Sequence, residues 1–337
     1  MLRMIGKSVL LLAAAVVLCC VLYPATLWAI GQTVFPFQAN GSLVKGPDGA
    51  VVGSRLIAQP FTRDDYFQPR PSAASYDGSS SGSSSLAVSN YALRDRVARA
   101  IGPIATYRSG PEAGQRVAPD VEQWFQKDRF QGAPHLVAQW ADLHNGLAQA
   151  WVGADPGHTA YVDAWAKAHP AAVARFAKDN PATPRPRAAD LAVVFFKDFA
   201  QAHPGRFPAP VTQNGPDGKP RTRILPVQDG PDVQSIFFDM WRQEHPDADL
   251  AELPSDLVTA SASGLDPNIS LGNAEFQLGR VVARRAADSH QDPAVVREKI
   301  RKILENRTEA PWNGLIGEPM VNVLEVNLDL CKAFPAH

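Results

Sequence analysis

A long uncharged stretch near the N-terminus is the feature that most constrains this chain. No Asp, Glu, Lys or Arg occurs from Ser8 to Val44, and the residues from Val9 to Ile30 are almost all apolar. As a helix, this apolar segment would be about 33 Å long, close to the roughly 30 Å hydrocarbon core of a bilayer. We therefore predict an uncleaved single-pass membrane anchor over residues 1–32, with the span at about 9–30.

Two other interpretations of this segment fit less well. A cleavable signal peptide has an apolar core of roughly 7–15 residues, which is shorter than the segment found here. A lipoprotein anchor needs a small residue before the modified cysteine, whereas Leu18 precedes Cys19, and Cys19 itself precedes Cys20.

Charge on either side of the span predicts its orientation. Arg3 and Lys7 precede the span, and the first basic residue after it is Lys45. The positive-inside rule then places the N-terminus in the cytoplasm and the rest of the chain outside, in the periplasm of a bacterium with an inner membrane. Cys331 is the one cysteine beyond the span, so no internal disulfide is available there.

The rest of the 337-residue chain has the composition of a globular protein, and its patterns predict an α+β fold. The 33 Lys and Arg balance the 34 Asp and Glu, which argues against a nucleic-acid-binding surface. Residues 50–57 resemble a short strand, and Leu324–Leu330 alternate apolar with polar residues as a half-buried strand does. Ser270 can cap a helix running to about Ala287, and Asp292-Pro293 can open another helix with its apolar residues on one face.

Residues 110–250 differ in character and predict a largely helical insertion. An aromatic residue is followed four positions later by His or Asn and then by Pro, in four copies that each indicate the last turn of a short helix. These copies are Trp165–Pro170, Phe176–Pro181, Phe199–Pro204 and Trp241–Pro246. Leu136, Trp140, Leu143, Leu147 and Trp151 are spaced as one amphipathic helix.

Motifs for catalysis or metal binding are scarce. His169, His203 and His245 end three of the four copies, where a histidine complements the helix dipole without binding a metal. No two histidines have the i, i+4 spacing of a zinc-binding helix. Ser80 lies in a Gly-x-Ser-x-Gly match, but this match lies in a Gly/Ser-rich loop rather than at a strand-to-helix turn. We therefore expect no metal site and no catalytic residue.

Several polar and glycine-containing motifs occur in an order that resembles a known family. They are Gln38–Leu43, Gly53–Thr62, Tyr66–Ser72, Val258–Ser270 and Gly317–Leu328, together with Tyr23-Pro24 and Phe35-Pro36 in and after the anchor. With these motifs the chain resembles KdpC, the C subunit of the Kdp potassium-transporting P-type ATPase. The resemblance covers about residues 5–95 and 254–330. This chain has Asn268 where the family usually has His.

The resemblance implies a fold, a role and partners. It implies a soluble domain made of residues 33–109 and 251–337, interrupted by the 110–250 insertion, in a non-catalytic accessory subunit. The partners implied are KdpA, KdpB and KdpF together with membrane lipid, and not nucleic acid. ATP and K+ would belong to the complex, since the C subunit is described as raising the pump subunit's affinity for ATP. The residues expected in a contact or functional loop are Asn40, Arg70, Ser261, Ser263, Gly264, Asp266, Asn268, Glu318 and Asn322.

Two other classes of protein stay open at this point. A membrane-anchored hydrolase would need a catalytic constellation, and only the rejected Ser80 offers one. A membrane-anchored extracytoplasmic binding module could instead use the aromatic-rich residues 110–250.

Overall fold

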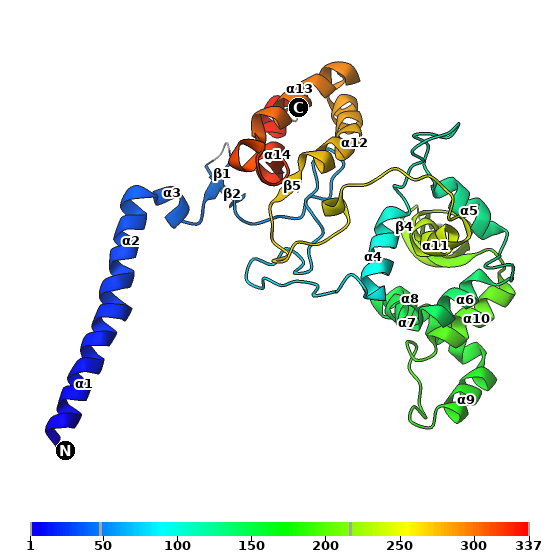
Figure 1. The fold of residues 1–337 in the computed structure, drawn as a ribbon. Helices are drawn as coiled ribbons and strands as arrows, with labels where there is room; N and C mark the ends of the chain where they lie inside the picture. The colour runs from blue at the N-terminus through cyan, green and yellow to red at the C-terminus, as the bar shows by residue number, and fades with distance from the viewer. Residues whose placement is uncertain (1, 47–48, 216–217, 336–337) are drawn as a thin grey trace. The chain divides into compact units, whose positions relative to one another are not determined.

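The computed structural model describes residues 2–46, 49–215 and 218–335. The chain divides into two compact units (Figure 1). Unit 1 combines Met1–Ser85 with Pro254–His337, and unit 2 is the intervening Leu86–Leu253. Unit 1 is therefore assembled from two distant segments of sequence, and unit 2 from one.

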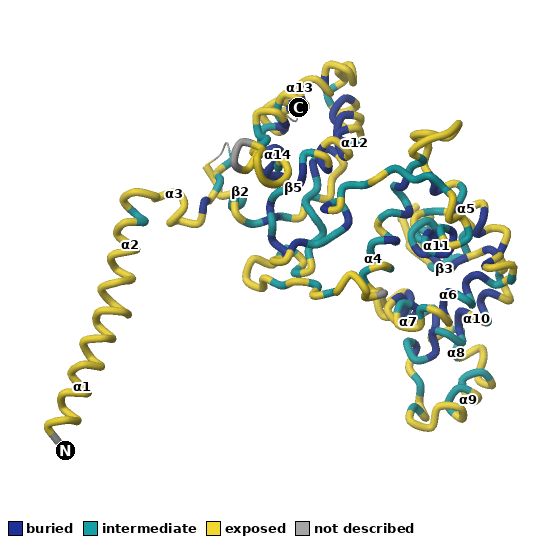
Figure 2. The backbone as a smooth tube through the Cα atoms, viewed as in Figure 1, coloured by how far each residue is buried: buried dark blue, intermediate teal, exposed yellow. Residues whose placement is uncertain are grey.

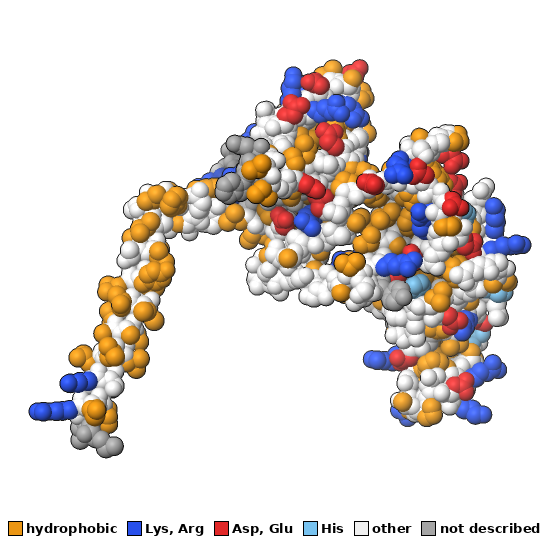
Figure 3. Space-filling model, viewed as in Figure 1, with side chains coloured by type: hydrophobic (Ala, Val, Ile, Leu, Met, Phe, Trp, Pro, Cys, Tyr) orange, Lys and Arg blue, Asp and Glu red, His pale blue; other side chains and the backbone are white. Residues whose placement is uncertain are grey.

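A long helix opens the chain, as the uncharged stretch predicts. It comprises α1 (Leu2–Val16), a π-helical turn (Val17–Leu22) and α2 (Tyr23–Val34), and it is followed by the short α3 (Pro36–Ala39). From Arg3 to Val34 it is long and apolar enough to cross a membrane, with a mean hydropathy of 2.5 over its best window. Its surface is exposed throughout that window and covered with hydrophobic side chains (Figures 2 and 3).

The π-helical turn has a physical cause in Pro24. A proline inside a helix has no N–H to donate, and its ring collides with the carbonyl four residues earlier. Here the Tyr23 N–H bonds to the Leu18 oxygen, five residues back instead of four. The wider turn lets the helix continue past the proline instead of ending at it.

In the described residues, the rest of unit 1 consists of small sheets packed with three helices. The hairpin of β1 (Leu43–Lys45) and β2 (Val51–Ser54) is antiparallel, and β2 is the only part of the predicted strand 50–57 that forms. A second antiparallel sheet has the order β5 (Asn268–Ser270), β7 (Met320–Asn322), β6 (Thr308–Glu309). Its helices are α12 (Leu271–Ser289), α13 (Pro293–Arg307) and α14 (Val323–Ala333), and short 3-10 turns lie at Ser255–Leu257 and Pro311–Gly314.

Both predicted helix starts in unit 1 are confirmed, but the predicted strand 324–330 is wrong. The Ser270 hydroxyl accepts from the Asn273 N–H, and the Asp292 carboxylate accepts from the Ala294 N–H. The segment after Asn322 is helix α14. Its buried side chains follow a helical face, which packs into the core with α12 and α13; the set is Val323, Leu324, Val326, Asn327 and Leu330.

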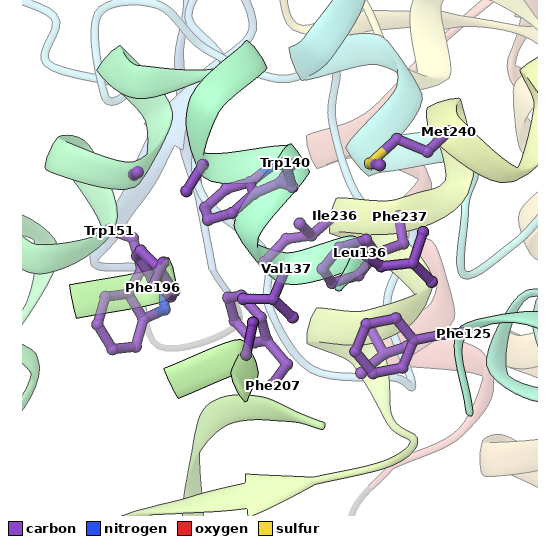
Figure 4. Close-up of a cluster of buried hydrophobic side chains, with 14 of the residues drawn as sticks. Phe125, Leu136, Val137, Trp140, Trp151, Phe196, Phe207, Ile236, Phe237 and Met240 are labelled. Carbon is purple, nitrogen blue, oxygen red and sulfur yellow. The ribbon is translucent and has the colours of Figure 1, made fainter. Parts of the chain in front are cut away.

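Unit 2 is mainly helical and has its own aromatic core. Its elements are α4 (Tyr91–Ile101), α5 (Ala118–Gln126), α6 (Leu136–Leu143), α7 (Asn145–Ala154), α8 (Pro156–Ala168), α9 (Pro170–Asp179), α10 (Ala192–Ala202), β3 (Phe207–Asn214), β4 (Pro220–Val227) and α11 (Pro231–Glu244). Strands β3 and β4 form an antiparallel hairpin. Trp140 lies in the core, with its ring centre 5.2 Å from Phe196 and 5.7 Å from Phe207 (Figure 4).

All four predicted helix ends before proline are confirmed. Helices α8, α9, α10 and α11 each end two residues before their Pro, and the residue between them is the C-cap. In α8 and α11 the capping histidine's Nδ1 lies 2.8 Å from the carbonyl oxygen of the tryptophan four residues earlier, and the two rings stack. Capping therefore accounts for these histidines.

The single amphipathic helix predicted over residues 136–151 is instead two helices. His144 ends α6 and precedes α7, and its backbone lies outside the helical region. Leu143 is consequently exposed, whereas Trp140 and Trp151 are buried as predicted. The 3.6-residue spacing continues across the break, which is why the pattern did not reveal it.

Candidate functional site

The loop from Ser261 to Ser270 is bound along its length by an earlier segment of unit 1. The Ser72 hydroxyl donates to the Gly264 oxygen (2.5 Å), and the Gly82 N–H donates to the Ser263 oxygen (3.0 Å). The Ala58 N–H donates to the Leu265 oxygen (2.9 Å). Three successive carbonyls of the loop are therefore satisfied by residues 58–82, and this Ser261–Ser270 loop is held in one conformation.

Gly264 lies where the loop comes closest to the backbone of Ala74 and Gly82. Its φ of +69° lies in the left-handed region, which residues with a side chain rarely adopt. A Cβ there would lie 2.8 Å from the Gly82 oxygen and 2.9 Å from the Ala74 nitrogen. Both neighbours are backbone atoms, so the site admits glycine alone.

Polar side chains fix the second half of the loop. The Asp266 Oδ1 accepts from the Asn268 N–H (3.0 Å) and from its side-chain amide (3.2 Å), which forms a tight turn around Pro267. The Ser263 hydroxyl accepts from the Leu265 N–H (3.1 Å). Ser261 is buried, and its hydroxyl lies 3.4 Å from the Asp266 nitrogen.

Arg70 connects the loop to the segment that binds it. Its Nη1 lies 3.6 Å from the Asp266 Oδ2, while its buried Nε has no hydrogen-bond partner among the described residues. The Arg70 carbonyl accepts from the Tyr76 hydroxyl (2.8 Å), and burial raises the pKa of that phenol. Nearby, hydrogen bonds from Ser79 lower the pKa of the exposed Asp77.

A buried carboxylate that sequence reasoning missed holds the end of the loop. Asp256 accepts from both the Ser270 N–H (2.7 Å) and the Ser270 hydroxyl (2.9 Å). Ser270 can therefore donate to Asp256 while its oxygen caps α12. No local sequence motif predicts this contact, because Asp256 lies fourteen residues before Ser270, in a 3-10 turn.

The remaining predicted residues divide into two groups. Asn322 joins the loop, because it lies opposite Asn268 in the β5–β7 register, caps α14 and donates to the Arg55 carbonyl (2.9 Å). Asn40 instead ends α3, where its side chain donates to the Pro36 oxygen (2.6 Å). Glu318 is exposed in the coil before β7. The structure thus assembles seven of the nine residues and leaves Asn40 and Glu318 elsewhere.

The surroundings of Ser80 do not support a catalytic motif. Ser80 lies among turns, with neither a strand leading in nor a helix leading out, so the literal Gly-x-Ser-x-Gly match lacks a nucleophile elbow. No group of three metal-binding side chains converges in the part of the chain that the structure describes. What the loop offers is a rigid backbone with half-buried Asp266 and Asn268 and an exposed Ser263.

A known protein family matches the part of the chain that contains this loop. The family model described as "K+-transporting ATPase, c chain" matches residues 5–122 and 235–332, which is more than half of the chain and includes the whole loop. The chain belongs to the KdpC family. It is thus a non-catalytic subunit of a K+-transporting ATPase, and the resemblance drawn from the motifs is confirmed.

Individual KdpC proteins match to different extents. A "Potassium-transporting ATPase KdpC subunit" from Rhodopseudomonas palustris is 26% identical over 333 residues, or 99% of this chain and 100% of the relative. One from Parvibaculum lavamentivorans is 34% identical over 147 residues, or 44% of this chain and 78% of the relative. One from Pseudomonas aeruginosa is 52% identical over 79 residues, or 23% of this chain and 43% of the relative. The first match runs through unit 2, which the KdpC family model leaves largely unmatched.

Proposed function

We propose that the chain is the accessory subunit of a high-affinity, ATP-driven potassium import complex. In this role it stabilises the complex, promotes ATP use by the pump subunit KdpB, or does both, in contact with KdpA, KdpB and KdpF. The observation that carries the proposal is the family match across both segments of unit 1, together with a helix able to cross a membrane.

The proposed topology has the N-terminus in the cytoplasm and everything after residue 32 outside, at the cell inner membrane. Basic side chains lie at the start of the helix (Figure 3), where the sequence has Arg3 and Lys7, and they support this orientation. A reporter enzyme that works only outside the cytoplasm, fused after His337, is expected to be active, and a cytoplasmic reporter at the same place to be inactive. The opposite pair of results would reverse the topology and bring the domain to the side where ATP is.

An external subunit can act on ATP use without touching ATP. If the Ser261–Ser270 loop binds one conformation of the membrane subunits better than another, it shifts their equilibrium by that difference in affinity. A loop held at three consecutive carbonyls loses little conformational entropy on binding, which favours a contact role.

The contact role of Asp266 can be separated from its part in the turn. Asp266→Asn keeps an Oδ1 acceptor for Asn268 but removes the charge facing Arg70. We expect this variant to lose only about 1 kcal/mol of stability, since the Arg70–Asp266 ion pair is long (3.6 Å) and partly exposed, yet to impair assembly or potassium-dependent ATPase activity. The measurement is co-purification of the tagged chain with KdpA and KdpB, followed by assay of the complex.

Ser270→Ala is the structural control for that experiment. It removes the α12 cap and a donor to buried Asp256, and we expect it to destabilise unit 1 by about 1–2 kcal/mol. If Asp266→Asn assembles and transports normally, the loop is only a helix entry and the contact hypothesis fails.

We propose further that the 110–250 insertion, which lies within unit 2 (Leu86–Leu253), is separable and that its loss leaves the complex able to form. One continuous segment supplies it, and it contains its own aromatic core, both of which support independent folding.

A further inference from the structure

A second polar site lies in unit 1, away from the residues discussed so far. It is a pocket of about 330 Å³ walled by Arg63 and Asp65, by Arg284, Arg285 and Asp288 of α12, and by Phe334 after α14. Three guanidinium groups and two carboxylates therefore surround it, which leaves an excess of one positive charge on its walls.

One buried carboxylate serves two of the three arginines. Asp65 accepts two hydrogen bonds from Arg63, at its Oδ1 (2.8 Å) and Oδ2 (2.7 Å). The same Oδ2 lies 3.3 Å from Arg285 Nη2, and the Asp65 carbonyl accepts from Arg285 Nε (2.9 Å). Because Asp65 already has a bidentate partner in Arg63, it cannot neutralise both guanidinium groups.

Arg285 is left with an unused donor. Its residue exposure is 8%, and its buried Nη2 forms no hydrogen bond among the described residues despite the nearby Asp65. This N–H lies 3.3 Å from Asp65 but is not aligned with it, so the guanidinium is incompletely paired, and an anion in the pocket would help to neutralise its charge.

Arg284 can turn towards the same anion. Its partner Asp288 lies one helical turn along α12 at 3.1 Å, and both side chains are about half exposed. Such a surface pair contributes little stability, so exchanging Asp288 for a ligand oxygen costs little.

From these contacts we propose that the pocket binds a phosphate group through Arg63, Arg284 and Arg285. Guanidinium forks pair with phosphate oxygens in two-point hydrogen bonds, and the three guanidinium groups on the walls of the pocket outnumber its two carboxylates. The phosphate could be free in solution or carried by a lipid headgroup, since both present the same oxygens.

The test uses the full chain in micelles of an uncharged maltoside detergent. Sodium phosphate, titrated at constant ionic strength against sodium chloride, is expected to raise the melting temperature and to give saturable binding by calorimetry. Arg284→Gln and Arg63→Gln, both at exposed side chains, should each weaken phosphate binding about tenfold.

The matched control is Arg301→Gln, which makes the same change in charge on α13 at a half-exposed arginine paired with Glu275. It should leave phosphate binding unchanged. Equal losses in Arg301→Gln and Arg284→Gln, or no difference between phosphate and chloride, would overturn the proposal.

Lipid nanodiscs then assign the source of the phosphate. If the headgroup of an anionic phospholipid occupies the pocket, nanodiscs containing phosphatidylglycerol should suppress phosphate binding relative to phosphatidylcholine alone, whose phosphate is offset by its own choline cation, and Arg284→Gln should remove that difference. If the ligand is free phosphate, binding should be the same in both nanodiscs and still depend on Arg284.

Discussion

Replacing Gly264 with alanine is expected to destabilise unit 1 by about 2–4 kcal/mol. The added Cβ would be held at a φ of +69° and would press on two backbone atoms that cannot rotate away. Relief requires the Ser261–Ser270 loop to separate from residues 72–82, which breaks the bonds at Ser263 and Gly264. Hydrogen exchange followed by mass spectrometry should show faster exchange in β5 and at the start of α12.

Gly279→Ala provides the comparison. Gly279 is an exposed position in α12 without a positive φ, and a Cβ added there would meet no neighbouring part of the fold within 4 Å. Alanine at this position should therefore stabilise the helix by about 0.5–1 kcal/mol. If Gly264→Ala and Gly279→Ala both have wild-type exchange rates, the loop is not clamped as described and the proposed rigid contact surface loses its basis.

Replacing Trp140 with alanine should have the largest effect in unit 2, about 3–5 kcal/mol. The side chain is 1% exposed and contacts the rings of Phe196, Phe207 and Phe237, so its removal leaves a cavity that these rigid neighbours cannot fill. Urea unfolding followed by tryptophan fluorescence reports on this unit, because Trp124, Trp151, Trp165 and Trp241 remain in it.

The same variant tests the proposed separability of unit 2. If the insertion folds on its own, Trp140→Ala should still co-purify with KdpA and KdpB and leave hydrogen exchange in α12–α14 unchanged. Leu143→Ala, at a 61% exposed residue of the same helix, should change stability by less than about 0.5 kcal/mol. Loss of protection in α12–α14 on Trp140→Ala alone would show that the two units unfold together.

Local signals in the sequence predicted the elements that local physics determines. The Ser270 and Asp292 caps and the four helix ends before proline each depend on residues within one turn, and all six are confirmed. The apolar stretch likewise predicted the N-terminal helix, because length and composition alone decide whether a helix can cross a membrane.

Helix α14 shows where periodicity was insufficient. Leu324, Val326, Leu328 and Leu330 alternate as in a strand, but Val323, Asn327 and Leu330 also repeat at helical spacing. The deciding signal was Asn322 three residues before Glu325, which is a helix N-cap followed by an acidic residue in the first turn. At this position the helix cap outweighs a seven-residue alternation.

The candidate loop was predictable as a set of residues but not as a structure. Gly264, Asp266 and Ser270 were identified from their local turn chemistry and from the family motif. Their partners Ser72 and Arg70 lie more than 190 residues away in the sequence, and the buried Asp256 has no motif of its own. Such pairings depend on the tertiary fold, which a single sequence does not display.

The split of unit 1 into two segments has a consequence for the order of biosynthesis. Residues up to Ser85 leave the ribosome before any of unit 2, and their partners from Pro254 onwards emerge after it. At roughly 5–20 residues per second, the delay is on the order of ten to thirty seconds. During that interval Phe67, which is 1% exposed in the finished fold, has no α12 or α14 to pack against. Until the end of translation, the nascent chain therefore carries an apolar segment near its anchor that has no packing partner. Binding by a chaperone would matter most during this interval.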